Sequence, residues 1–187
     1  MLDAANFSVP QHRKRIYIVG FSKKIAEHKN FSFNWPLKHK EPVGIGQFIE
    51  SHEDDYSITK YYQQSYLFKK NDGRPQVIDK NSEIQVKTLV ATYYKVQRLT
   101  GTFVKDGKTG LRLLSHNECK AIMGFPKGFK FPVSRTQMYR QMGNSVAIPV
   151  VQEIAKAMME VLNTCVKNKT KPSKKETLPK KSVIVVA

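Results

Sequence analysis

The sequence YRQMGNSVAIPV spans residues 139–150 and joins a compact polar turn to a well-marked helix. Gly143 can adopt backbone angles that other residues avoid, and it lets a ligand approach closely. Asn144 and Ser145 offer short hydrogen-bonding groups ahead of the helix. Pro149 suits the first turn of a helix. The pattern therefore predicts a turn that contacts a small ligand, followed by a helix that reaches about residue 162.

The predicted helix has one buried face, because its apolar residues recur at steps of three and four. They are Val150, Val151, Ile154, Ala155, Met158, Val161 and Leu162. A Gly-Asn-Ser turn before an amphipathic helix is by itself usually only a helix cap. The ligand-binding interpretation therefore depends on the rest of the sequence.

In that context, Arg-Gln-Met-Gly-Asn-Ser-Val followed by a proline-initiated helix resembles the last motif of the DNA cytosine-5 methyltransferases. The resemblance implies that the turn lines the S-adenosylmethionine pocket. The residues it implies for cofactor binding are Gly143, Asn144, Ser145 and Val146, which we call the cofactor turn.

Composition points to a polyanionic partner. The chain has 187 residues, enough for one ordinary domain or two small ones, with 32 Lys and Arg against 15 acidic residues and a formal charge of +17. A basic protein without such a partner remains the alternative. Two cysteines and five histidines without ligand spacing predict neither a disulfide framework nor a metal site. There is no apolar run of membrane-spanning length and no signal-peptide pattern, so a cytoplasmic protein is expected.

Residues 16–21, Ile-Tyr-Ile-Val-Gly-Phe, are mostly β-branched or aromatic, and hardly any polar group interrupts them. This composition predicts a strand that is buried on both faces of a sheet. Such a strand needs neighbours, yet no other parallel-sheet strand precedes it. We therefore expect the rest of the sheet to come from elsewhere.

The preceding residues 9–15, Val-Pro-Gln-x-Arg-x-Arg, resemble the eighth motif of the same methyltransferases. The resemblance implies that Gln11, Arg13 and Arg15 lie at the catalytic face, with Arg15 approaching the O2 edge of a flipped cytosine. An arginine suits this role, because its charged planar fork can hold a carbonyl oxygen or a phosphate. Taken alone, an Arg-x-Arg pair is more often part of a solvated basic loop.

Residues 35–111 have a looser pattern, with a turn at 72–75, a strand expected over 83–90 and a hairpin expected at Asp106-Gly107. In the resembling family this interval is the target-recognition domain, and Thr88-Leu89-Val90-Ala91 resembles the start of its DNA-reading loop. We call residues 88–98 the reading loop. The candidates for DNA contact are Thr88, Tyr93, Tyr94, Lys95, Gln97, Arg98 and, further on, Arg112. The alternative is an ordinary aromatic and polar hairpin.

Residues 112–126 contain Ser115 and Glu118 in the order of a capping box, and Gly124 and Pro126 to end the helix. This stretch resembles the family's ninth motif, which implies a structural role. Cys119 is expected to be a small buried apolar residue and not a nucleophile. Beyond it, residues 164–187 are rich in Lys and are expected to form a disordered tail that adds nonspecific affinity for DNA.

The resemblance covers residues 5–162 and corresponds to the C-terminal half of the family. The Pro-Cys nucleophile, the Glu-Asn-Val acid and the Phe-x-Gly-x-Gly donor loop are absent from the sequence. The resemblance implies an α/β fold in which pieces of a Rossmann-like methyltransferase domain, residues 1–34 and 112–163, flank a small, mostly β recognition domain, residues 35–111.

The resulting hypothesis is the smaller chain of a split DNA cytosine-5 methyltransferase from a bacterium or phage, cytoplasmic and associated with the nucleoid. Its expected partners are double-stranded DNA, S-adenosylmethionine and a complementing subunit with the first seven motifs; no metal and no membrane are expected. A remnant of a once-continuous gene, a non-catalytic DNA-binding protein and an RNA-directed relative remain alternatives.

Overall fold

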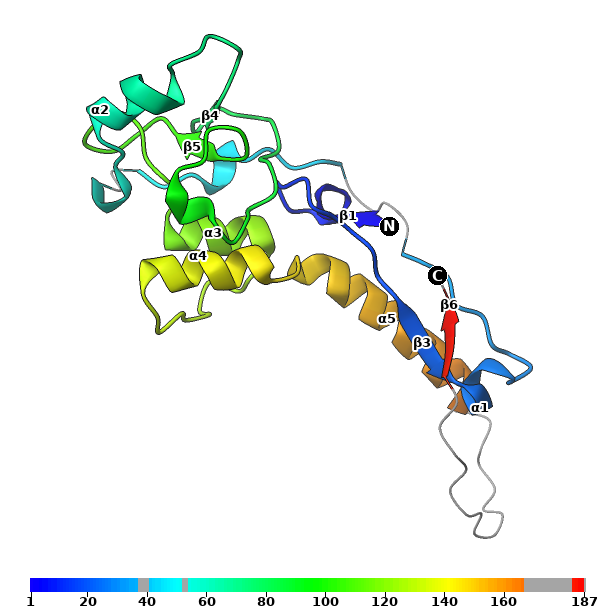
Figure 1. The fold of residues 1–187 in the computed structure, drawn as a ribbon. Helices are drawn as coiled ribbons and strands as arrows, with labels where there is room; N and C mark the ends of the chain where they lie inside the picture. Colours follow the sequence, from blue (N-terminus) through cyan, green and yellow to red (C-terminus); the bar gives the residue numbers. More distant parts are fainter. Residues whose placement is uncertain (37–40, 52–53, 167–182, 187) are drawn as a thin grey trace.

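The molecule is elongated, with a large lobe at one end and an arm at the other (Figure 1). The computed structural model describes residues 1–36, 41–51, 54–166 and 183–186. Each part has its own buried apolar cluster. The cluster of the large lobe draws on residues from Ile45 to Met142, and that of the arm on residues from both ends of the described chain, Ala4 to Phe21 and Ala147 to Cys165.

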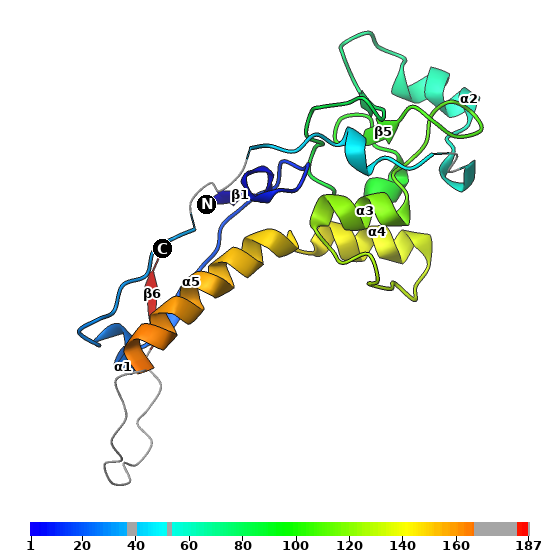
Figure 2. The same ribbon diagram turned by 180° about the vertical axis from the view of Figure 1, so that it is seen from behind.

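The arm is built on α5 (Ile148–Val166), with β3 (Val19–Ser22) running beside it in both views (Figures 1 and 2). Val19 and Phe21 are buried in the same cluster as Val150 and Ile154 of the helix. The predicted amphipathic helix is therefore confirmed, although it extends beyond Leu162. Val151 and Ala155, which were expected on the buried face, are exposed.

The predicted strand over 16–21 is shorter and is buried on one face only. β3 begins at Val19, while Ile16 and Ile18 are 77% and 71% exposed. Alternate strand residues point to opposite faces, so packing on α5 covers only one of them.

β3 pairs antiparallel with β6 (Val183–Val186), with Val19 opposite Val186. The expected disordered tail is thus wrong at two places, because residues 164–166 belong to α5 and residues 183–186 form a strand. Its remaining residues, 167–182 and 187, lie outside the described residues. Val183 to Val186 are all β-branched, which favours an extended backbone.

In the large lobe, α3 (His116–Met123) packs on α4 (Arg135–Asn144). The predicted capping box is present, with Glu118 N donating to Ser115 Oγ at 3.2 Å and Ser115 N donating to Glu118 Oε2 at 2.7 Å. Gly124, at φ 73°, ends α3 as expected.

The α4 helix was not predicted from the sequence. Its first turn is capped by the Ser134 hydroxyl, which accepts from Gln137 N, and its buried residues include Met138, Tyr139 and Met142. Gly143 and Asn144 therefore close a helix, and the expected turn is confined to the few residues between α4 and α5.

The large lobe has less strand than the predicted, mostly β recognition domain. β4 (Gln76–Ile78) and β5 (Thr102–Val104) form a parallel pair, and Val104 bridges Arg112 around the Asp106-Gly107 turn, as a hairpin would. The strand expected over 83–90 is not formed; in its place Val86 makes one isolated bridge to Gln11. The other short elements are β1 (Leu2–Asp3), β2 (Lys14–Arg15), α1 (Lys23–Ala26), α2 (Lys60–Tyr62) and the helical turns Ala4–Phe7, Gly46–Phe48, Asp54–Tyr56, Gln63–Leu67 and Tyr93–Lys95.

Among the described helices, none has the length and apolar character needed to span a membrane. Within the same residues, no group of three or more His, Cys, Asp or Glu side chains is arranged to hold a metal ion.

Candidate functional site

The segment Gln11–Arg15 connects the two parts of the molecule, and its side chains alternate in exposure from Gln11 to Lys14. Gln11 and Arg13 are buried, whereas His12, Lys14 and Arg15 are exposed. The alternation follows from an extended backbone, in which successive side chains point in opposite directions. Of the three residues expected at the catalytic face, only Arg15 has an exposed side chain.

Gln11 holds the reading loop against α3. Its Nε2 donates to Ile122 O at 2.9 Å in the last turn of that helix, and its Oε1 accepts from Leu89 N at 2.7 Å. The last carbonyl groups of a helix lack partners within the helix, so a side-chain donor satisfies one of them. Gln11 is therefore a positioning residue here, with both ends of its side-chain amide engaged within the chain.

Arg13 holds the same loop against α4. Its Nη1 donates to Leu89 O at 3.0 Å, and its Nη2 donates to Gly143 O at 2.8 Å and also to Ser145 O. The two latter oxygens lie at the C-terminal end of α4, where the helix dipole favours a cation. Burial, and then the neighbouring charge of Arg15, lower the pKa of Arg13 to about 10, so the guanidinium stays charged at neutral pH.

Gly143 is needed for a contact within the chain. A Cβ atom on Gly143 would lie 2.2 Å from Ala91 N and 2.3 Å from Val90 C. Gly143 is buried at the end of α4 and does not have a positive φ, so the expected special backbone angle does not explain it. Its missing side chain lets the backbone of the reading loop pack directly on the helix.

The remaining cofactor-turn residues are accessible. Asn144 and Val146 are exposed and Ser145 is partly exposed. A short amide, a hydroxyl and an apolar side chain side by side suit a ligand with both polar and apolar groups, as S-adenosylmethionine has.

Three of the expected DNA-contact residues are structural in this fold. Tyr93 is buried, and its hydroxyl donates to Thr102 O and accepts from Leu114 N. Arg98 is buried and donates from Nε to Leu67 O at 2.8 Å and from Nη2 to the Asp72 carboxylate. It therefore closes the 67–74 segment, and its fork is engaged there.

Arg112 is the third of these residues. It is fully buried and makes a two-pronged ion pair with Glu118, with both N–O distances at 2.8 Å, and a further pair with Asp106 at 3.0 Å. Two carboxylates compensate its charge, so a contact with a DNA phosphate is not required and its position excludes one.

The reading loop still presents polar groups. Lys95 is exposed, and Gln97 is partly exposed, with its Oε1 accepting from the hydroxyls of Thr92 and Thr100. The amide NH2 of Gln97 is thereby oriented. Thr88 donates to His12 O at 2.6 Å, which ties the start of the loop to the same segment as Gln11 and Arg13.

Arg140 is a polar residue of this region that the sequence analysis did not select. It is exposed on α4, donates from Nη2 to the Tyr94 hydroxyl at 3.1 Å and places its guanidinium 5.4 Å from the centre of the Tyr94 ring. Its position within the last motif, four residues before Asn144, was the only signal in the sequence.

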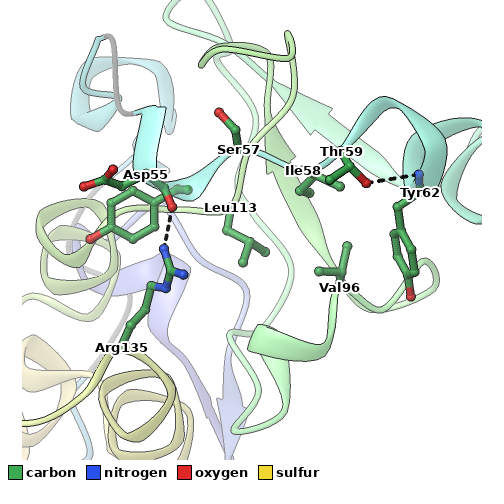
Figure 3. A pocket seen from close by; sticks show the side chains of 9 residues that line it. Asp55, Ser57, Ile58, Thr59, Tyr62, Val96, Leu113 and Arg135 are labelled. Carbon is green, nitrogen blue, oxygen red and sulfur yellow. Dashed lines mark hydrogen bonds between the residues drawn. The ribbon is translucent and has the colours of Figure 1, made fainter.

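A pocket of about 250 Å³ lies beside the reading loop (Figure 3). Ile58, Val96 and Leu113 give it an apolar lining, and Arg135 donates to Asp55 O at its edge. Val96 has φ 53°, an uncommon value for a β-branched residue. Neither Arg15 nor the cofactor turn lines this pocket, so it is not part of the candidate catalytic site.

Solved structures share this fold. The chain aligns with DNMT2 from Spodoptera frugiperda, crystallised as a triple mutant, with a TM-score of 0.63 at 19% identity, over 84% of this chain and 56% of that one. It aligns with the methyltransferase EhMeth of Entamoeba histolytica with a TM-score of 0.62 at 18% identity, over 86% and 52%.

Sequence relatives are closer. The Type II methyltransferase M.MspI of Moraxella sp. is 57% identical over 164 residues, which cover 88% of this chain and 38% of the relative. M.BsuFI of Bacillus subtilis is 54% identical, over 87% of this chain and 39% of the relative. The chain thus spans about two fifths of the length of these relatives.

The family model described as C-5 cytosine-specific DNA methylase matches residues 1–160. This match takes in the segment with Gln11 to Arg15, the reading loop, α3, α4 and α5 as far as residue 160. The chain therefore belongs to the C-5 cytosine-specific DNA methylase family.

Proposed function

We propose that this chain provides DNA recognition and part of the S-adenosylmethionine pocket for methyl transfer to C5 of cytosine. Transfer needs a complementing polypeptide that carries the nucleophile. The contact of Arg13 with Ser145 is the observation that supports the proposal most, because Arg13 binds the cofactor turn and lies two residues before the exposed Arg15 in the sequence. Residues distant in sequence are thereby assembled beside one another.

The need for a complement follows from the chemistry. Methylation of cytosine at C5 requires a thiolate that attacks C6, and a cysteine acts in this way only where it is accessible and its pKa is not raised. Cys119 and Cys165 are buried, and burial raises the pKa of the Cys119 thiol well above its usual value. Neither thiol can serve, so the nucleophile has to come from another segment.

This chain contributes orientation and charge. The target base must leave the helix to be reached. The exposed Arg15 guanidinium supplies a positively charged fork for the O2 edge of that base, while Lys95, Gln97 and Thr88 of the reading loop hold the DNA. S-adenosylmethionine supplies the methyl group when it is bound against Asn144, Ser145 and Val146.

The test is complementation. The chain is co-expressed with the part of the Moraxella relative that it does not match, and transfer of a tritiated methyl group to DNA is measured. We expect no transfer by the chain alone and transfer by the pair. Activity of the chain alone would contradict the proposal, as would an assembled pair that binds DNA and transfers nothing.

Within the active pair, Arg15→Ala separates chemistry from binding. We expect it to abolish transfer and to leave DNA affinity within about twofold, because an exposed arginine aimed at the base edge acts on the flipped base and contributes little to holding the duplex. Lys14→Ala, the exposed neighbour on β2, is the matched control and should transfer at the wild-type rate. Equal losses of methyl transfer in the two variants would show that Arg15 does not have the proposed role.

A second candidate function is DNA binding without catalysis. The reading loop is complete within this chain, and the formal charge of +17 favours a polyanion. This alternative predicts sequence-specific DNA binding by the chain alone and no gain of methyl transfer in the co-expressed pair.

A further inference from the structure

We propose that Arg13 is a positioning residue that couples the cofactor turn to the reading loop, so that a cofactor bound at the turn strengthens DNA binding by the loop. The inference rests on the proposed function and extends it to the communication between the two binding sites.

The coupling begins with the geometry of one guanidinium. Arg13 donates to Leu89 O on the reading loop and to Gly143 O and Ser145 O at the cofactor turn. Its planar fork fixes the direction of each N–H group, and hydrogen bonds weaken steeply when the angle is lost. Leu89 and the end of α4 therefore have to move together.

Two further contacts restrict the same loop residues. Gln11 accepts from Leu89 N, so both backbone groups of Leu89 are held by one extended segment. The backbone of Ala91 packs directly on the Cα of Gly143. Leu89 to Ala91 thus form a base for the reading loop that follows any shift of α4.

Because Arg13 is charged and buried, we expect its contacts with the reading loop and with the cofactor turn to be kept together or lost together. The guanidinium is almost completely buried, and its Nε lacks a hydrogen-bond partner among the described residues. No ion pair joins Arg13 to an acidic side chain of the described chain, so carbonyl oxygens and the helix dipole compensate its charge. Losing one of the segments would leave a buried charge poorly compensated, which is costly.

The deciding experiment uses the co-expressed pair and measures the DNA dissociation constant with and without S-adenosylhomocysteine, the demethylated analogue of S-adenosylmethionine that methyl transfer leaves behind and that fills the cofactor site. We expect the wild-type pair to bind DNA at least about fivefold more tightly with the analogue. In Arg13→Lys, which keeps the charge and loses the fork, the ratio should fall to about one. Lys14→Gln should keep the wild-type ratio.

A purely structural role gives a different result, because it would weaken DNA binding equally with and without the analogue and leave the ratio unchanged. That outcome overturns the inference, as does a ratio of one in a wild-type pair that methylates DNA. A wild-type pair without methyl transfer counts against the proposed function instead.

Hydrogen exchange of the chain alone tests the clamp independently of catalysis. Arg13→Lys should raise the exchange of amides at 89–91 and at 145–147 together, while amides in the middle of α3 keep their protection. Faster exchange in only one of the two segments overturns the inference.

Discussion

At the scale of single residues, the buried arginines bind partners within the chain and thereby stabilise its fold. Arg112 is the clearest case, since Glu118 also accepts from Ser115 N and Glu50 N and thereby joins three segments. Arg112→Met would leave the Glu118 charge buried, and we expect a loss of about 3–5 kcal/mol in the free energy of unfolding, measured with urea. Adding Glu118→Gln should recover part of that loss, because it removes the buried charge. The recovery is incomplete because Ser115 N and Glu50 N donate to different oxygens of Glu118, and the single amide oxygen replaces only one of these acceptors. A double variant as unstable as the single one would contradict this account.

Gly143 offers a second test at this scale. Gly143→Ala places a methyl group against the Ala91 backbone, and we expect a loss of about 1–3 kcal/mol in spite of the better helix propensity of alanine. Gly128→Ala is the control, because nothing lies within 4 Å of its Cβ position. Equal unfolding free energies for the two variants would show that the loop can retreat from the helix.

At the scale of elements, the start of α3 is joined to the helical turn Asp54–Tyr56 by a hydrogen bond of 2.7 Å between the Tyr56 hydroxyl and His116 Nδ1. Burial, and then the charges of Lys120 and Arg135, lower the pKa of His116 below its usual value of 6.5. The unfolded chain therefore binds a proton first as the pH falls. The resulting stability is complete above pH 6.5 and decreases below it.

We thus expect the urea midpoint to drop between about pH 7.5 and about pH 5.5, and to drop less in His116→Asn, which cannot titrate in this range. The midpoints of the two proteins at each pH are the measurement. Parallel pH profiles for wild type and variant would exclude this histidine as the cause.

The elements also show what sequence can predict. α3 was predictable because its caps, Ser115, Glu118 and Gly124, lie within or beside the helix. α4 was missed because its glycine and asparagine resemble a turn, and the stabilising contact of Gly143 is with residues some fifty positions away. Likewise, Arg15 and Asn144 could be selected from motifs, whereas the structural role of Arg13 depends on carbonyl groups 76 and 132 residues distant.

At the scale of the whole molecule, the arm carries an uncovered apolar face with Ile16 and Ile18, opposite the face that packs on α5. Burial of such side chains in a complementing segment would drive association. We expect Ile18→Asp to weaken complementation at least tenfold, measured as the dissociation constant of the pair, with little change in the stability of the chain alone. Ile84→Asp, at another exposed isoleucine, should leave the complex intact.

The pairing of β3 with β6 also has a steric consequence for assembly. A strand has two hydrogen-bonding edges, and Val183–Val186 already occupy one of those of Val19–Ser22. In the proposed assembly, a strand of the complementing polypeptide can pair with Val19–Ser22 without displacement only along the opposite edge of β3. Alternatively, the incoming strand replaces residues 183–186 in the pairing with β3. Residues 183–186 would then become accessible to protease cleavage.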